Sequence, residues 1–320
     1  MCFSLRCQGY SLWECYNLFM KIISLLPAAT EIVCLLGLEK SLVGVSDDSD
    51  FPEGVSKLPK VTTTTMGPNL SSLEIDKKVK AAKHRGSSVF HIDTKVLAEL
   101  APDLILTQEL CPVCAPAFTD VEKAAKKILH NTQIISLEPH SIFDILKNIQ
   151  TVGELTETKQ KAKEILVSLQ SRLSVLSKKL ISKKKPSVLI IEWLDPVMIA
   201  GHWVPEMVQR AGGAILIAKK KEPSRYLSWD DVILLDPDCI IVAPCGFSIQ
   251  RTVREISLLK QKKDFKKLKA HKNSRIFLVD GNAYLTRPGP RIIDGTEIMA
   301  EILHPKIFQR NYSRSAWRPL

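Results

Sequence analysis

The stretch ETKQKAKEILVSLQSRLSVLSKKLISKKK (residues 157–185) decides how this chain is divided. Its apolar residues recur at steps of three or four, and they are Ala162, Ile165, Leu169, Leu173, Leu176 and Leu180. That spacing predicts one helix with a single apolar stripe. Neither glycine nor proline interrupts it before Pro186. A helix of about 25 residues spans roughly 37 Å, the width of a domain. We therefore expect residues 158–185 to be a stiff connecting helix and not a flexible linker.

Strands and helices alternate on both sides of this helix. Short apolar runs such as KIISLL (21–26) and SVLIIEW (187–193) are each followed by a segment with helical spacing. Such alternation is typical of mainly parallel sheets that helices cover on both faces. The sequence therefore predicts an α/β fold with two Rossmann-like lobes. The N-terminal lobe is expected at 20–157, and the C-terminal lobe, with a short tail, at 186–320.

The composition is that of a globular protein with a basic balance. The chain has 320 residues, of which 45% are hydrophobic and 25% charged, and its net charge is +11. Lysines gather in three segments, 177–186, 218–223 and 259–273. No aromatic interleaving or RNA-binding signature accompanies them. We therefore interpret the lysines as solvated helix faces and expect no nucleic-acid partner.

Residues 1–19 form an N-terminal extension of unknown role that ends where the alternation begins. The extension lacks the apolar core and the small-residue cleavage site of a signal peptide. No run in the chain approaches 18 apolar residues, so we expect no membrane insertion. The eight cysteines are scattered and do not form the framework of a secreted, disulfide-rich domain. These features predict a cytoplasmic protein, and we expect a monomer.

The stretch TQELCPVCAP (107–116) places two cysteines just after the apolar run DLILT. A structural zinc site needs four ligands, commonly two such pairs, and this chain has one CxxC. A thioredoxin-like pair starts a helix after the first strand of its domain, whereas Cys111 and Cys114 follow a later strand and enclose a proline. Two interpretations have more support: small buried residues at a turn, or one wall of a ligand site.

In open α/β sheets, ligands bind beyond the carboxyl ends of the strands. The unusual residues of this chain concentrate in those loops, and they include Trp193, His202, Trp203, Tyr284 and the cysteine pair. Aromatic and soft side chains in such loops predict a wide, partly apolar pocket. Each residue also has a plainer interpretation. His202 could cap the next helix or bond a backbone carbonyl, and Trp193 could belong to the core.

The sequence offers little with which to catalyse a reaction. The motifs GxGxxG, GxxxxGK[ST], HExxH and GxSxG are all missing from it. Nor does any strand-end loop assemble a Ser, His and Asp set. We therefore expect a binding protein and not an enzyme.

Five long stretches, in collinear order between Met20 and Pro305, carry a family resemblance. They are IISLLPAATEIVCLLGL, VTTTTMGPNLSSLEID, LAPDLILTQELCPVCA, IEWLDPVMIAGHWVPEMVQRAGG and GPRIIDGTEIMAEILHP. They resemble the cobalamin-binding family of ABC-importer substrate-binding proteins, in particular the signal-less branch with a CxxC loop. The resemblance implies two Rossmann-like lobes bridged by a rigid helix, with the ligand in the cleft between the lobes. The same helical-backbone fold serves receptors for iron-siderophores, haem and metals.

The resemblance also implies which residues contact the ligand. They are Pro27, Ala28 and Thr30 in the first loop, Glu109, Cys111 and Cys114 in the second, Glu192, Trp193, His202 and Trp203 in the facing lobe, and Tyr284 and Arg287 at its rim. Aromatic faces would stack on a flat macrocycle. Cys111, Cys114 or His202 could approach the metal of a bound chelate. The protein would hold no metal or cofactor of its own, and cobalamin or a similar corrinoid would be its ligand.

Several uses of the fold remain open at this point. The resemblance implies an ABC permease as a partner, whereas the lack of an export signal favours an intracellular carrier for a corrinoid or another metal chelate. A thiol-dependent enzyme would use Cys111 and Cys114 for redox work or for processing a corrinoid. A receptor for siderophore-iron, haem or a free metal ion is the remaining alternative, because a fold does not fix its ligand.

Overall fold

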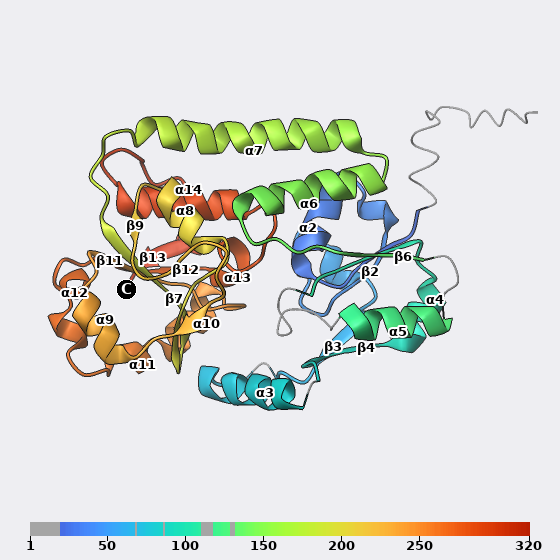
Figure 1. Ribbon diagram of the computed structural model, residues 1–320, viewed down its shortest axis with the longest axis horizontal. Coiled ribbons are helices and arrows are strands. Elements are labelled where there is room, and N and C mark those ends of the chain that lie inside the picture. Colours follow the sequence, from blue (N-terminus) through green and yellow to red (C-terminus); the bar gives the residue numbers. More distant parts are fainter. Residues whose placement is uncertain (1–19, 68, 86, 110–117, 129–131) are drawn as a thin grey trace, which may run out of the picture. The chain divides into compact units, whose positions relative to one another are not determined.

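The chain folds into two compact α/β units. The computed structural model describes residues 20–67, 69–85, 87–109, 118–128 and 132–320 (Figure 1). The first unit comprises residues 20–65, 82–138 and 148–163, and the second comprises 66–81, 139–147 and 164–320. Two segments of the N-terminal half, 66–81 and 139–147, therefore group with the second unit. The contiguous boundaries of the two lobes and of the 158–185 connection stay predictions, and the extension 1–19 lies outside the described residues.

The first unit is built on a parallel sheet of four strands in the order β2-β1-β5-β6. β1 (Ile22–Ser24) and β5 (Leu104–Thr107) form its centre and are buried along their whole length. Burial on both faces explains why each strand is a continuous apolar run. Ile23, Ile105 and Val121 meet in the core. The other elements are α2 (Pro27–Leu35), η1 (Glu39–Ser41), β2 (Leu42–Val45), η2 (Val55–Lys57), β3 (Thr62–Thr64), β4 (Phe90–Ile92), α4 (Thr94–Leu100), α5 (Phe118–Ile128) and β6 (Gln133–Ser136).

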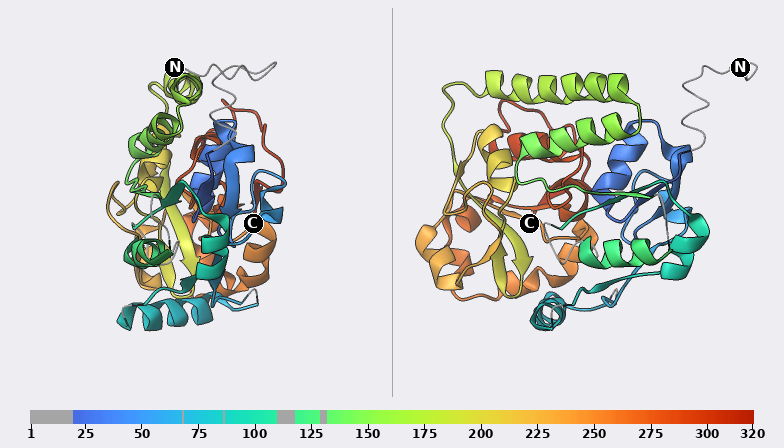
Figure 2. Two further views of the ribbon diagram at one scale, coloured as in Figure 1. Left: turned by 90° about the vertical axis from the view of Figure 1, so that its right-hand side faces the viewer. Right: turned by 45° about the vertical axis from the view of Figure 1, so that its right-hand side comes forward.

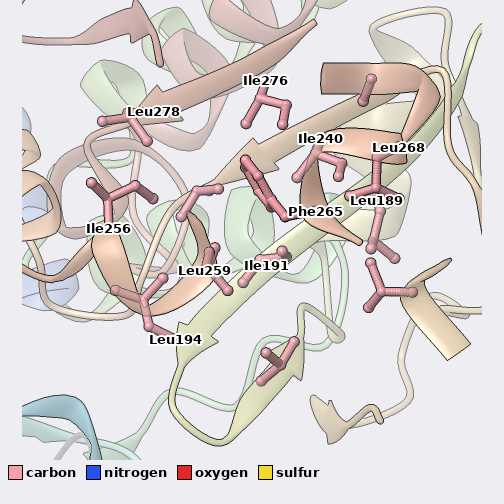
Figure 3. Close-up of a cluster of buried hydrophobic side chains, with 14 of the residues drawn as sticks. Leu189, Ile191, Leu194, Ile240, Ile256, Leu259, Phe265, Leu268, Ile276 and Leu278 are labelled. Carbon is pink, nitrogen blue, oxygen red and sulfur yellow. The ribbon is translucent and has the colours of Figure 1, made fainter. Parts of the chain in front are cut away.

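The second unit has a mixed, seven-stranded sheet. Its order is β10-β8-β7-β11-β12-β13, and β9 pairs with β7. β7 (Ser187–Leu194), β11 (Cys239–Val242) and β12 (Ile276–Val279) run parallel at the centre, so their carboxyl ends meet at one edge. Figure 3 shows Leu189, Ile240 and neighbouring side chains packed on this sheet. The other elements are β8 (Val197–Ile199), α8 (Val204–Arg210), β9 (Ala214–Ile215), β10 (Arg225–Tyr226), α9 (Trp229–Leu235), α10 (Ile249–Glu255), α11 (Ser257–Lys260), η3 (Phe265–Lys267), α12 (Lys269–Lys272), α13 (Gly281–Tyr284), α14 (Ile292–Leu303) and β13 (Trp317–Pro319).

The long helix is present and uninterrupted. After α6 (Ile142–Leu155), helix α7 (Lys159–Lys179) runs for 21 residues (Figure 2), a length of about 30 Å. Its stripe is buried as expected, except that Ile165 is half-buried. The helix ends earlier than the sequence suggested, because Ser182 adopts a φ of 58° and such a residue cannot continue a right-handed helix. The expected fold class is confirmed: two Rossmann-like α/β units and one long helix.

Within the second unit, Arg172 of α7 is held by α14. Its Nε donates to Glu297 at 2.9 Å, and its Nη2 donates to Asp294 at 2.5 Å and to Glu297 at 2.6 Å. The hydroxyl of Tyr312 donates to Glu297 at 2.6 Å. Burial acts to raise the pKa of Glu297, but the bonds from Arg172 and Tyr312 outweigh it and lower that pKa. Bidentate Arg–carboxylate pairs of this kind fix orientation, so the network sets how α7 lies on α14.

Helix α3 (Ser72–His84) was not foreseen. It begins with a capping box: the Ser71 N–H and Oγ donate to Glu74 Oε2 at 2.8 and 2.7 Å. The Glu74 N–H donates back to Ser71 Oγ at 3.3 Å. A Ser followed three residues later by Glu is a recognised helix start. The stretch SSLE (71–74) is therefore a local signal for this helix start, although no apolar run accompanies it.

Candidate ligand-binding site

The strand-end loops of the second unit interlock at the carboxyl edge of its sheet. The Cys245 N–H donates to the carbonyl of Glu192 at 3.0 Å, which joins the β11 loop to β7. The Asn282 N–H donates to the Phe247 carbonyl at 3.2 Å, which joins the β12 loop to the β11 loop. A Cβ at Gly281 would lie 2.2 Å from the carbonyl oxygen of Pro244, so only glycine fits there. This is the edge at which ligands of open α/β sheets bind.

Glu192 lies near the end of β7, and its side chain is half-buried. Ser224 Oγ donates to its Oε2 at 2.9 Å. Burial raises the pKa of this carboxyl to about 7, although hydrogen bonds from Ser224 and from the Gly201 N–H act to lower it. A carboxyl with a pKa near neutrality can either donate or accept a hydrogen bond at physiological pH.

His202 follows β8 with an unusual backbone, φ 54°. Its N–H donates to the Glu222 carbonyl at 2.6 Å, and its carbonyl accepts from the Lys221 N–H at 2.8 Å, so the conformation is held from both sides. Backbone strain of this kind gathers at functional sites. The Nδ1 atom is buried and has no hydrogen-bond partner among the described residues. Burial, and secondarily the nearby His140, lowers the pKa of His202, so its imidazole is neutral at pH 7.

His140 lies beside His202, and the sequence did not predict this neighbour. It belongs to segment 139–147 of the second unit, and its ring centroid lies 6.4 Å from that of His202. The two residues are far apart in the chain, and no motif joins them. A neutral imidazole at His202 could accept a hydrogen bond or coordinate a metal centre. The described residues contain no cluster of three or more His, Cys, Asp or Glu that could hold a free metal ion.

Trp193 and Trp203 are more buried than the predicted stacking role requires. They are 8% and 6% exposed. Trp193 Nε1 donates to the Ser72 carbonyl at 3.1 Å, and its ring lies 5.2 Å from that of Phe247. Trp203 Nε1 donates to the Leu285 carbonyl at 2.8 Å. These two indoles therefore hold the loops together, as buried Trp residues with a satisfied N–H do, and their contact with a ligand stays a prediction.

The start of α3 contributes to the same edge. Besides the bond from Trp193, Ser72 donates its N–H to Glu255 Oε2 at 2.9 Å, and the Arg251 guanidinium donates to the Leu70 carbonyl. Arg251 also lies over the Phe247 ring, 4.7 Å from its centroid. Segment 66–81 is therefore fastened to the strand-end loops by long-range contacts. The stretch VTTTTMGPNLSSLEID carries part of the family resemblance, but its contacts with Trp193, Arg251 and Glu255 could not be predicted from the sequence.

Tyr284 and Arg287, expected at the rim, are half-buried in the loop after β12. The Tyr284 ring lies 6.3 Å from that of Tyr312. The Arg291 guanidinium lies 5.9 Å from the centroid of the Tyr284 ring. Trp203 bonds the adjoining residue Leu285. The structure therefore brings the rim residues near the Trp203 loop.

The predicted site residues of the first unit come from two loops, and the first loop supplies Pro27, Ala28 and Thr30. Pro27 is half-buried at the first turn of α2, where proline is favoured. Ala28 and Thr30 are buried, 3% and 0% exposed. Thr30 Oγ1 donates to Ser24 Oγ at 2.9 Å and lies 2.9 Å from Ser49 Oγ. Its hydroxyl thus serves a buried network and is not presented to solvent.

Glu109 is exposed, and its N–H donates to Glu138 Oε1 at 2.5 Å. The preceding Gln108 is buried, and its Oε1 has no partner among the described residues. Cys111 and Cys114 lie outside the described residues, so their role as a site wall stays a prediction. The ligand contacts expected of the other site residues likewise stay predictions: Pro27, Ala28, Thr30, Glu109, Glu192, Trp193, His202, Trp203, Tyr284 and Arg287.

Sequence relatives cover almost the whole chain. An ABC transporter substrate-binding lipoprotein of Bacillus subtilis, YvrC, is 26% identical over 302 residues, 90% of this chain and 81% of the relative. A vitamin B12-binding protein of Vibrio vulnificus is 25% identical over 289 residues, 88% of this chain and 89% of the relative.

Solved structures show the same fold. The periplasmic vitamin B12-binding protein BtuF of Vibrio cholerae superposes with a TM-score of 0.65 at 20% identity, over 88% of this chain and 96% of that one. A periplasmic haem-binding protein of Pseudomonas aeruginosa superposes with a TM-score of 0.69 at 19% identity, over 94% and 95%. At such identities the likeness concerns the fold alone.

These relatives overturn one expectation. The cytoplasmic location predicted from residues 1–19 is wrong, because the related proteins are a lipoprotein and periplasmic binding proteins, which point outside the cytoplasm. None of the helices in the described part of the chain is both long and apolar enough to cross a membrane.

The family follows from the fold, the strand-end loops and the match along the chain. The family model described as periplasmic binding protein matches residues 22–283, which include most of both units and the whole of α7. Its members carry a ligand as cargo and not a resident cofactor, as the sequence led us to expect. The chain belongs to the periplasmic binding protein family, as a substrate-binding protein of the ABC-importer type.

Proposed function

We propose that this protein binds a corrinoid such as cobalamin, without transforming it, and passes it to an ABC permease. The observation that carries the proposal is the relation to vitamin B12-binding proteins over 88% of the chain. Relatives of that name recur, with 23% identity over 91% of this chain in Vibrio cholerae. A similarity of such length favours a shared class of ligand.

The strand-end loops of the second unit offer suitable chemistry for a corrin. A corrin carries peripheral amide side chains, which need both donors and acceptors. Glu192, with a pKa of about 7, can meet either need. His202, whose pKa is lowered by burial, offers a neutral imidazole. A neutral imidazole can bond an amide or coordinate a metal centre.

The test is a titration of the purified protein with aquocobalamin, followed by the corrin absorbance. We expect saturable binding at micromolar concentration or tighter, and weaker binding of haemin in a parallel titration. A folded protein that leaves the corrin spectrum unchanged, or that prefers haemin, contradicts the proposed ligand.

Two sets of variants sharpen the titration. His202→Ala should weaken binding by about tenfold, the loss of one good polar contact. The matched control, His91→Ala, removes an exposed imidazole from β4 of the first unit and should bind like the wild type. Changing Cys111 and Cys114 to Ser tests the non-enzymatic part of the proposal. Steady-state conversion of the corrinoid by the wild type, lost in that double variant, would instead support a thiol-dependent enzyme.

A further inference from the structure

Two of the three lysine-rich segments come together in the second unit. The loop after α7 and the loop after β9 both border a groove of about 450 Å³. Lys185 lines it from the first loop, Lys220 from the second, and Arg210 from the end of α8. In Figure 1 the C-terminal end of α7 lies near α8 and α14. We define the basic surface by the last turn of α7, these two loops and the end of α8. Its members are Lys178, Lys179, Lys183, Lys184, Lys185, Arg210, Lys219, Lys220 and Lys221.

The loop after α7 is fixed in place. Leu180 is 8% exposed and packs against Gly212, where a Cβ would lie 3.0 Å from its Cδ2. Gly212 adopts a φ of 78°, and its carbonyl lies 3.1 Å from Nε2 of the buried His304. The backbone that carries the next lysines is therefore anchored at Leu180, and again at Pro186, whose carbonyl accepts the Ala214 N–H at 2.8 Å.

Little negative charge opposes this surface. Glu206 is the one carboxylate among the described lining residues, and Arg210 pairs with it at 3.1 Å. Glu206 also accepts the Ile142 N–H at 3.2 Å. Glu222 pairs with Lys219 at 3.5 Å. All nine cations are exposed, so two carboxylates leave most of their charge uncompensated.

Local roles explain only part of this charge. Lys178 and Lys179 lie in the last turn of α7, where cations stabilise a helix end. Lys219 has its partner in Glu222. No such role applies to the run Lys183 to Lys185, which lies beyond the helix. In the middle of the cations, Ile181 is 68% exposed.

We propose that the basic surface docks on a membrane that contains anionic phospholipids. Clusters of four to eight lysines bind such surfaces by electrostatic attraction. An exposed Ile between lysines adds an apolar group that can enter the boundary between headgroups and acyl chains. Lysines also bind nucleic-acid phosphates, but nucleic-acid surfaces commonly add arginine forks and aromatic stacking. The nine residues of the basic surface include one arginine and no aromatic residue.

The experiment is co-sedimentation with vesicles of phosphatidylcholine, with and without phosphatidylglycerol. We expect binding only with phosphatidylglycerol, and a decrease as salt rises. The triple variant Lys183→Gln, Lys184→Gln, Lys185→Gln should bind at least about tenfold more weakly. Its matched control changes Lys263, Lys266 and Lys272 to Gln, which removes the same charge from exposed positions in the third lysine segment. The control variant should lose less than about twofold in affinity for the anionic vesicles.

Three results would overturn the proposal. The wild type fails to sediment with anionic vesicles, or both triple variants lose affinity equally, which would trace binding to net charge alone. In the third, duplex DNA at equal phosphate concentration strips the protein from the vesicles, which would identify a nucleic-acid partner. Ile181→Ser should weaken binding to anionic vesicles by about fivefold. If that variant binds as tightly as the wild type, Ile181 makes no apolar contribution to docking. Each variant is also titrated with aquocobalamin, so that loss of vesicle binding stays distinct from loss of ligand binding.

Discussion

Glu192 lies near the end of a buried strand, in surroundings that disfavour a negative charge. Its pKa is raised from 4.5 to about 7 by burial. Below pH 4.5 the carboxyl is protonated in both the folded and the unfolded chain. As the pH rises towards 7, the unfolded chain loses the proton first, so stability falls across that window. Glu192→Gln removes this loss. We expect the variant to be about 2–3 kcal/mol more stable than the wild type at pH 8 and equally stable at pH 4.5.

Guanidinium unfolding at a series of pH values measures the difference. Glu222→Gln is the control, because Glu222 is 54% exposed and the exchange removes one carboxylate from the surface of the same unit. If the free energy of unfolding of Glu192→Gln differs from that of the wild type by the same amount at every pH from 4.5 to 8, the Glu192 carboxyl is charged and hydrogen-bonded in the folded protein. The sequence predicts Glu192 as a site residue but not its pKa, because the burial that raises the pKa depends on the tertiary structure.

Helix α7 was the most predictable element of the fold. The contacts that attach it to α14 were the least predictable feature. The stripe from Ala162 to Leu180 follows from spacing alone, since helical periodicity is local. The Arg172 network depends on Asp294, Glu297 and Tyr312, more than 120 residues away. Such long-range partners leave no local pattern. For the same reason the hydrogen-bond partners of the Trp193 and Trp203 indoles could not be predicted from the sequence, whereas α3 has a local start signal in SSLE.

The Arg172 network should contribute measurably to stability. Arg172→Met leaves two acidic groups and a phenol without their cation, in a site that is only partly open to water. We expect a loss of about 2–3 kcal/mol in the free energy of unfolding, less than for a fully buried pair because Arg172 is 33% exposed. Lys267→Ala breaks an exposed pair with Asp264 and should cost under about 0.5 kcal/mol. Equal effects in chemical denaturation would show that the α7–α14 network is no stronger than a surface pair.

On the scale of the whole molecule, the fold class and the family could be read from the sequence, whereas the location could not. The alternation of strands and helices determines the fold class, because helices and strands differ in the spacing of their apolar residues and each can be recognised locally. The N-terminal residues were interpreted as evidence for the cytoplasm, but the related proteins include a lipoprotein and periplasmic receptors. Ligand identity is also poorly encoded, since side chains from many loops define it.

Ligand binding should stabilise the second unit, where we place Glu192 and His202. A ligand at 100 times its Kd adds about 2.7 kcal/mol to the state that binds it. Two units need not unfold as one, so a probe of one unit is required. Four of the five tryptophans, Trp193, Trp203, Trp229 and Trp317, belong to the second unit, and Trp13 lies in residues 1–19.

A Trp13→Phe variant therefore reports on the second unit through its emission maximum, which is preferred to intensity because a bound corrin quenches fluorescence. We expect saturating cobalamin to raise the midpoint of this transition by several degrees, and His202→Ala to remove most of that rise at the same ligand concentration. A midpoint that does not move, while the corrin spectrum shows binding, would mean that the ligand is held by residues outside the second unit. The assignment of Glu192 and His202 would then be wrong even though the protein binds corrinoids.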